Sequence, residues 1–342
     1  MITPPYLKKG DKVGVVAPAR WVKAEEIEEA LKIIESWGLE IVKGENLYKQ
    51  YHQFAGTDEQ RAADLQGMLD SESIRAIICA RGGYGIVRIV DMLNFGGFCL
   101  NPKWLVGFSD ITVLHSHIQQ NFGIETIHAS MPFGYVDGDS TNASLETLRM
   151  ALFGESIEYE LTPGQYSRKG FAQAKITGGN LSLLCNIIGS VSDCDTDGKI
   201  LFLEDVDEYL YHIDRMMQQL KRSGKLRNLA GLIVGNMSDM HDNVIPFGMN
   251  VREIIANAVA EYDYPVLFDF SSGHEALNKA LILGRTVILE SGENKAKLSF
   301  LHNLSRGLKN VVPRRFFITT GLIFILFIAI YFIYYLVFKL LL

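Results

Sequence analysis

The chain has 342 residues, which is long for one average domain and sufficient for two. With 48% apolar and 21% charged residues, it has the composition of a globular protein that can form a sizeable core. The net charge of −6 and the lack of a basic stripe argue against a nucleic-acid partner.

The first half of the chain alternates strand-like and helix-like segments. We expect helices at Glu25–Trp37, from Thr57 onward, at Ile86–Leu93 and at Ile111–Gln120, and strands at Lys12–Ala17, Glu40–Val42, Ile74–Ala80 and Trp104–Phe108. This alternation predicts a parallel sheet with helices on its faces. In such a sheet the ligand crevice lies at the carboxyl ends of the strands.

The second half has the same character after a polar stretch. Residues 156–171 are expected to form a linker between an N-terminal domain, 1–155, and a C-terminal domain, 172–303. The predicted strands of the C-terminal domain are Lys199–Leu203, Ala230–Gly235, Pro265–Phe268, and short ones around Ala280–Leu289 and Lys297–Leu301. Its predicted helices open at the GGN of 178–180 and lie near Tyr211–Arg222 and Val251–Tyr262. The expected fold is therefore a two-domain α/β protein with a Rossmann-like N-terminal parallel sheet.

The C-terminal residues predict a membrane anchor. Residues 316–338 carry no charge and have about the length needed to cross a bilayer as a helix, and the segment 304–315 before them is basic. The positive-inside rule then places the N-terminal body in the cytoplasm, so the predicted localisation is a cytoplasmic catalytic body anchored to the inner membrane.

The four cysteines predict no metal or redox site. Cys79, Cys99, Cys185 and Cys194 contain no CxxC pair, and three of them lie in or beside apolar runs. They are expected to be free thiols in a reducing compartment, and neither a zinc site nor any other cofactor is expected.

Ser109 is the first candidate for chemistry. It follows a predicted buried strand in the sequence GFSD and precedes a predicted helix. A serine on such a turn has the setting of a nucleophile elbow, with the amide of Asp110 placed to stabilise an oxyanion, although the GxSxG signature is missing. The alternative is that Ser109 only caps the helix.

The segment RGGYG, 81–85, is a second candidate loop after a strand. Its glycines could supply a second oxyanion donor, cradle a phosphate, or simply allow positive φ. The full phosphate-binding patterns are absent, so nucleotide binding has little support.

Glu204 and His274 are the remaining candidates. Glu204 ends an apolar strand and opens the acidic run 204–208, which could be a solvated loop, a metal site, or the source of a carboxylate that orients a histidine. His274 lies on a glycine-containing loop after a predicted strand, free to reach another domain. His115, His117 and His128 follow the candidate serine and are rivals.

Eight short motifs in one order resemble those of the LD-carboxypeptidase family of serine peptidases. They are VGVVAP, FAGTDEQRAADL, RGGYG, GFSD, GGNL, LEDVDE, IDRM and SGHE. This family includes the murein tetrapeptide carboxypeptidases and the microcin C self-immunity proteins. The resemblance spans about residues 10–280; Arg20, where the family usually has serines, and the hydrophobic tail depart from it.

The resemblance implies a homodimer with Ser109 as nucleophile, His274 as general base and Glu204 as the residue that orients the histidine. It also implies an oxyanion hole formed by the amides of Gly83 and Asp110, and no metal. The expected reaction releases the terminal D-alanine from a murein tetrapeptide during cell-wall recycling. The alternatives are cleavage of a peptidyl-nucleotide antibiotic of microcin C type and a non-catalytic, membrane-tethered peptide-binding module.

Overall fold

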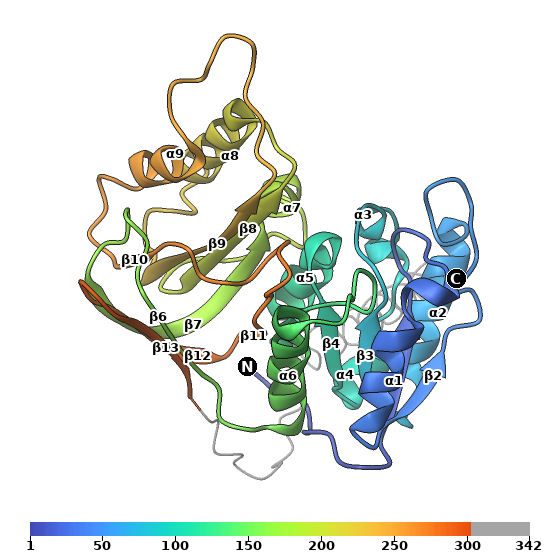
Figure 1. The fold of residues 1–342 in the computed structure, drawn as a ribbon. Coiled ribbons are helices and arrows are strands. Elements are labelled where there is room, and N and C mark those ends of the chain that lie inside the picture. The colour runs from blue at the N-terminus through green and yellow to red at the C-terminus, as the bar shows by residue number, and fades with distance from the viewer. Residues whose placement is uncertain (302–342) are drawn as a thin grey trace, which may run out of the picture. The chain divides into compact units, whose positions relative to one another are not determined.

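The computed structural model describes residues 1–301, which form two β-sheets with flanking helices (Figure 1). The strands are β1 (Lys12–Val16), β2 (Glu40–Lys43), β3 (Ile74–Cys79), β4 (Trp104–Gly107), β5 (Thr126–His128), β6 (Glu158–Leu161), β7 (Gly170–Asn180), β8 (Ile200–Val206), β9 (Gly231–Ser238), β10 (Val266–Leu267), β11 (Leu281–Leu283), β12 (Thr286–Ser291) and β13 (Ala296–Phe300). The helices are α1 (Glu28–Ser36), α2 (Asp58–Asp70), α3 (Ile86–Ile89), α4 (Gly96–Leu100), α5 (Thr112–Phe122), α6 (Asp139–Phe153), α7 (Leu181–Asn186), α8 (Leu210–Arg222) and α9 (Val251–Ala258), with 3-10 turns η1 (Ala24–Glu26), η2 (Val90–Met92) and η3 (Ser109–Ile111).

The first sheet has six strands in the order β11-β5-β4-β3-β1-β2. Its strands β1 to β5 pair in parallel, as the alternating pattern predicts, so their carboxyl ends share one edge. Helices α1 and α6 pack on one face, and α2, α3, α4 and α5 pack on the other. Ser109 follows β4 and the RGGYG loop follows β3, so both lie at this edge.

The second sheet has seven strands in the order β10-β9-β8-β7-β12-β13-β6 and is mixed. Strands β7 to β10 pair in parallel, and β6, β12 and β13 add antiparallel strands. One face is covered by α7, α8 and α9 (Figure 1). Apolar residues of the other face, such as Ile200, Phe202 and Ile233, join the same core as residues of the first sheet. This shared core fixes the position of one sheet against the other.

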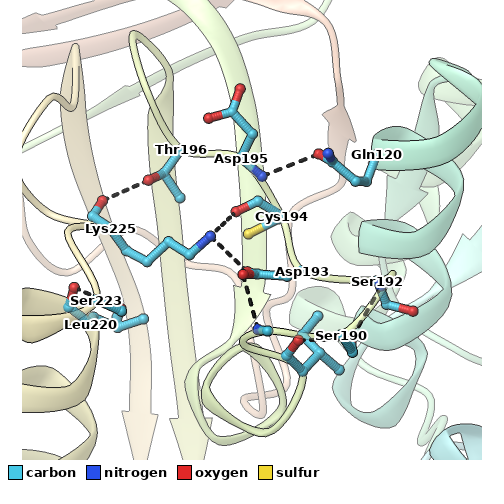
Figure 2. Close-up of polar contacts among 12 residues, drawn as sticks. Gln120, Ser190, Ser192, Asp193, Cys194, Asp195, Thr196, Leu220, Ser223 and Lys225 are labelled. Carbon is cyan, nitrogen blue, oxygen red and sulfur yellow. Dashed lines mark hydrogen bonds and ion pairs between the residues drawn. The ribbon is translucent and has the colours of Figure 1, made fainter.

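Residues 189–198, which connect α7 to β8, contact both halves of the described chain (Figure 2). Gln120 of α5 accepts a hydrogen bond from the Asp195 amide at 3.2 Å. On the other side, the Lys225 ammonium donates to the Cys194 carbonyl and pairs with Asp193, both at 2.7 Å. The connection is therefore held by α5 from one side and, from the other, by Lys225 in the segment between α8 and β9.

The predicted transmembrane helix has no support in the described part of the chain. No helix within residues 1–301 is both long and apolar enough to cross a membrane. The longest described helix, α6, has 15 residues, whereas a bilayer core needs about 20. The segment 316–338, which carried the prediction, lies outside the described residues. The fold class is therefore corrected to a two-domain α/β protein with mixed sheets, and the localisation at the inner membrane, which depended on the same helix, is withdrawn.

Two further expectations about individual elements need correction. The short strand β11 was assigned to the C-terminal half, but it pairs antiparallel with β5 at the edge of the first sheet, so that sheet is not purely parallel. The helix expected at Ile86–Leu93 is one α-helical turn, α3, followed by the 3-10 turn η2. The linker at 156–171 stays a prediction, and β6 lies within that range.

A buried ion pair near the junction of the two sheets allows the stability of that junction to be tested. Arg285, between β11 and β12, contacts Glu125, just before β5, at 2.6 Å, and both side chains are almost fully buried. We expect Arg285→Met to lower the free energy of unfolding in urea by about 3–5 kcal/mol, because Glu125 loses its buried guanidinium partner. The double variant Glu125→Gln/Arg285→Met should recover part of that loss.

Arg149 provides the matched control. It pairs with Glu146 and Glu155, whose side chains are 53% and 44% exposed. We expect Arg149→Met to cost less than about 1 kcal/mol, because water screens and solvates those carboxylates. Equal losses for Arg149→Met and Arg285→Met would contradict a special role for the buried pair.

Candidate active site

Ser109 lies on a strained turn between β4 and α5. Its φ is +62°, a left-handed conformation that costs a non-glycine residue on the order of 1 kcal/mol or more. The turn is tight against the glycine loop, since a Cβ added to Gly82 would lie 3.0 Å from the Ser109 Cβ and 3.2 Å from its Oγ. A strained serine between a strand and a helix is typical of a nucleophile elbow.

Asp110 ties this turn to the RGGYG loop. Its side chain is fully buried, and its Oδ2 accepts a hydrogen bond of 2.9 Å from the Ile86 amide at the start of α3. Burial raises the pKa of Asp110 to about 6, although the hydrogen bond from Ile86 acts in the opposite direction. The Asp110 side chain thus holds the loop that carries Gly83. In the described part of the chain, the Gly83 amide donates to no backbone carbonyl.

Arg61 also supports this loop and was not singled out from the sequence. Its guanidinium is buried and donates to the carbonyls of Pro18 at 2.6 Å and Gly85 at 3.1 Å, and it pairs with Asp58. The one feature of the sequence that could have indicated a role for Arg61 is its position within the motif FAGTDEQRAADL. Arg20, where the sequence departs from the family pattern, lies against the loop as well, because its side chain occupies the space next to Gly83.

Glu204 and His274 form a hydrogen-bonded pair. Glu204 lies near the carboxyl end of β8 with no exposed side-chain surface, and its Oε2 is 2.7 Å from the His274 Nδ1. Gly273 allows this approach: its φ is +134°, and a Cβ there would lie 3.0 Å from the Glu204 Oε2. The loop is held by Asn278, whose Oδ1 accepts from the Gly273 amide at 3.1 Å. This carboxylate can therefore fix the orientation of the imidazole.

The electrostatics of the pair favour a protonated imidazole. Burial acts to lower the pKa of His274, but the hydrogen bond and charge of Glu204, together with the charge of Asp205, raise it above the ordinary value. Asp205 was not singled out from the sequence. Burial, and then the charge of Glu204, raise its pKa to about 7. Its carboxylate accepts from the Asn180 side chain and the Ser182 amide, both at 2.9 Å. It thus joins β8 to residues 178–182, where β7 passes into α7, which we call the GGN turn.

The turn that carries Ser109 contacts the loop that carries His274 through the side chain of Phe108. The Phe108 ring lies 4.8 Å from the His274 ring, measured between centroids. The first turn of α5 also contacts the GGN turn, since the Asn180 amide donates to the Thr112 hydroxyl at 3.0 Å. The structure thus brings Glu204 to His274 and brings the neighbour of Ser109 to the same imidazole. Within residues 1–301, the Ser109 hydroxyl makes no hydrogen bond to His274.

The three rival histidines are buried groups of the first half. Burial lowers the pKa of His115 to about 4, and its Nε2 lies 2.9 Å from the Gly107 carbonyl. His117 bonds Ser192, and His128 lies fully buried between Phe108 and Phe202 with its pKa lowered, chiefly by burial. No carboxylate of the described residues contacts any of the three.

The acidic run 204–208 does not form a metal centre. Within residues 1–301 no group of three His, Cys, Asp or Glu side chains is arranged to hold a metal ion. The carboxylates of this run point to different partners: Glu204 to His274, Asp205 to the GGN turn and Asp207 to the exposed His241.

Comparison with known proteins identifies the family. Residues 13–129 match the LD-carboxypeptidase N-terminal domain and residues 173–289 match the LD-carboxypeptidase C-terminal domain. A probable murein peptide carboxypeptidase from Bacillus subtilis is 35% identical over 300 residues, which cover 86% of this chain and 93% of that protein.

Two solved structures have a similar fold. The muramoyltetrapeptide carboxypeptidase from Oxalobacter formigenes matches with a TM-score of 0.78 and 24% identity, over 85% of this chain and 99% of that one. The microcin C7 self-immunity protein MccF, in complex with aspartyl sulfamoyl adenosine, matches with a TM-score of 0.79 and 20% identity, over 89% of this chain and 100% of that one. The family predicted from the eight motifs is confirmed: the chain belongs to the LD-carboxypeptidase family and is a serine carboxypeptidase.

Proposed function

We propose that the chain is an LD-carboxypeptidase that releases the terminal D-alanine from murein tetrapeptides. The observation that carries this proposal is the 2.7 Å hydrogen bond between Glu204 and His274, beside the strained turn of Ser109. Ser109 is the nucleophile, His274 the general base, and Glu204 the group that holds the imidazole. The curated relative from Bacillus subtilis, named a probable murein peptide carboxypeptidase, supports the choice of substrate.

In the proposed mechanism each of the three groups has one role. Because Glu204 accepts from Nδ1–H, the Nε2 of His274 is free to take the proton from the Ser109 hydroxyl as Oγ attacks the carbonyl carbon. The amides of Gly83 and Asp110 would donate to the oxyanion, each contributing about 3 kcal/mol. When the carbon–nitrogen bond breaks, His274 gives the proton to the leaving amine. Water then hydrolyses the acyl-enzyme with His274 again as base.

A second candidate keeps these residues and changes the substrate. MccF, whose structure is similar to this fold, is bound to aspartyl sulfamoyl adenosine, so a peptidyl-nucleotide is the competing substrate class. Turnover of a murein tetrapeptide and of an aminoacyl-sulfamoyl adenylate should be compared side by side. Membership of a peptidase family argues against the non-catalytic binding module. The homodimer implied by the motifs stays a prediction.

The nucleophile and the base can be tested directly. We expect Ser109→Ala and His274→Ala in the full-length chain each to reduce kcat by on the order of 10⁴-fold or more, because the groups act as one unit. Mass spectrometry of a murein tetrapeptide should show loss of one alanine with the native protein and none with the variants. Ser73→Ala, on the exposed turn before β3, is the control and should keep full activity. An active Ser109→Ala variant would reject the mechanism.

The pH dependence tests the role of Glu204. Since only neutral His274 accepts a proton, kcat/KM should fall as the pH drops through the raised pKa of His274. Glu204→Gln removes the largest influence that raises this pKa, so the acid limb should move to lower pH while kcat falls by on the order of 10⁴-fold. Glu275→Gln, which removes the neighbouring carboxylate bonded to Ser238, is the control and should leave the limb in place. An acid limb that stays in place in Glu204→Gln would contradict the assignment.

The glycine before His274 tests the geometry of the pair. We expect Gly273→Ala to lower kcat by about 10²-fold or more, because the new methyl group meets the Glu204 carboxylate and displaces the imidazole. Gly224→Ala, after α8, is a matched control: its φ is also positive, at +81°, but nothing lies within 4 Å of the added methyl group. It should cost about 1 kcal/mol of stability and leave kcat unchanged. Similar kcat values for the two variants would show that the close approach at Gly273 is unimportant.

A further inference from the structure

Four rings form a cluster at the carboxyl end of the second sheet, outside the groups assigned to catalysis. Tyr209 is at its centre, with ring centroids 5.5 Å from His241, 5.8 Å from Tyr211 and 5.9 Å from His212. Tyr211 and His212 lie 4.3 Å apart. The four residues come from the loop after β8, the start of α8 and the loop after β9. We call these four residues the ring cluster.

The ring cluster is open to solvent. Tyr209 is 41% exposed and Tyr211 39%, and neither phenol hydroxyl has a hydrogen-bond partner within the described chain. Adjacent exposed aromatic rings with unused polar ends are typical of a surface that binds a ligand with both apolar faces and polar groups.

Carboxylates border the rings and fix the two imidazoles. His212 Nδ1 is 2.7 Å from Glu208, and His241 Nε2 is 2.6 Å from Asp207. The Arg215 guanidinium lies 5.5 Å from the Tyr211 ring and covers part of it, which leaves Tyr209 as the more accessible platform. A border of carboxylates accepts hydrogen bonds from hydroxyl and amide groups and disfavours a phosphate. The preferred ligand is therefore uncharged near the rings and rich in hydroxyl groups.

The ring cluster is coupled to the catalytic loop by short contacts. Glu275, the neighbour of His274, accepts from the Ser238 hydroxyl at 2.7 Å. The Ser238 carbonyl in turn accepts from the Asp207 amide at 3.1 Å, and Asp207 holds His241. Tyr209 follows Glu204 by five residues, so their Cα atoms are at most about 18 Å apart.

We propose that the ring cluster binds the sugar ring of a muramoyl-linked tetrapeptide, with Tyr209 stacked on the apolar face of the sugar. This inference rests on the proposed function. In such a substrate the sugar is attached to the amino end of the peptide, so three residues and the linking acyl group separate it from the scissile bond, about 14 Å when extended. That span is shorter than the greatest separation that five residues allow between Tyr209 and Glu204, the residue that holds His274. The acyl link removes the charge of the muramoyl carboxyl group, which suits an acidic border.

Binding of a muramoyl dipeptide tests the inference without requiring catalysis. The probes are N-acetylmuramoyl-L-alanyl-D-isoglutamine and the same dipeptide with an N-acetyl group in place of the muramoyl group, so that both have an uncharged amino end, titrated into the full-length chain by calorimetry. We expect the sugar to tighten binding about tenfold, and Tyr209→Ala to abolish that gain. Tyr209→Phe keeps the ring and should keep most of the gain. Phe171→Ala removes a 62% exposed ring near the amino end of β7, far along that strand from the GGN turn, and should keep all of it.

The outcomes separate this inference from the proposed function. Equal affinity for the two probes, or an undiminished sugar effect in Tyr209→Ala, overturns the sugar site even if the tetrapeptide is hydrolysed. A sugar effect that depends on Tyr209 supports the site even if no alanine is released, and in that case only the proposed reaction fails. Circular dichroism of Tyr209→Ala should match the native protein, because the exposed ring contributes little to the core.

Discussion

The buried carboxylate of Glu204 is the constraint on which the rest of the site depends. A carboxylate without solvent must have partners, because the desolvation of a charge costs several kcal/mol. His274 provides that partner at 2.7 Å, and the loop that carries it is shaped by Gly273 and Asn278 so that the imidazole can reach the end of β8. Asp205, the adjacent carboxylate, is bonded instead to the GGN turn. The two acids therefore have separate hydrogen-bond partners, and only Glu204 is bonded to the histidine.

The strain at Ser109 needs an external cause, since no local preference of serine favours its φ of +62°. The contacts on both sides of the turn supply it. Gly82 closes on the Ser109 side chain, Asp110 is bonded to the first amide of α3, and Phe108 packs against His274. The turn is thus held by two neighbouring loops, one from each sheet. The packing between the sheets therefore supports both the strained turn and the contact of Phe108 with His274.

Sequence patterns predicted the helices and strands that are determined by residues close together in the chain. The helix α2 begins after Thr57 with the expected capping box, and β3 and β4 are the buried apolar runs that the sequence indicated. The strand β11 was misassigned because a three-residue run contains no signal for pairing with β5, about 150 positions earlier in the chain. The family was recognisable because short motifs occur in a fixed order. The contacts between those motifs could not be predicted, because the spacing of residues along the chain does not give their distance in space.

The same limit explains which side-chain roles were missed: those of Arg61 and Asp205, and that of the Asp110 carboxylate, since only the Asp110 amide was predicted to take part. Arg61, Asp110 and Asp205 are charged side chains next to turns, and in a sequence such residues resemble ordinary solvated groups. What distinguishes them is burial: it raises the pKa of Asp110 to about 6 and that of Asp205 to about 7, and Arg61 is enclosed by the carbonyls of Pro18 and Gly85. Burial is a property of the assembled sheets, so it appears only after the fold is known. In each case the charged side chain supports a turn of the site through buried hydrogen bonds, and no pattern along the chain distinguishes such a charge from a solvated one.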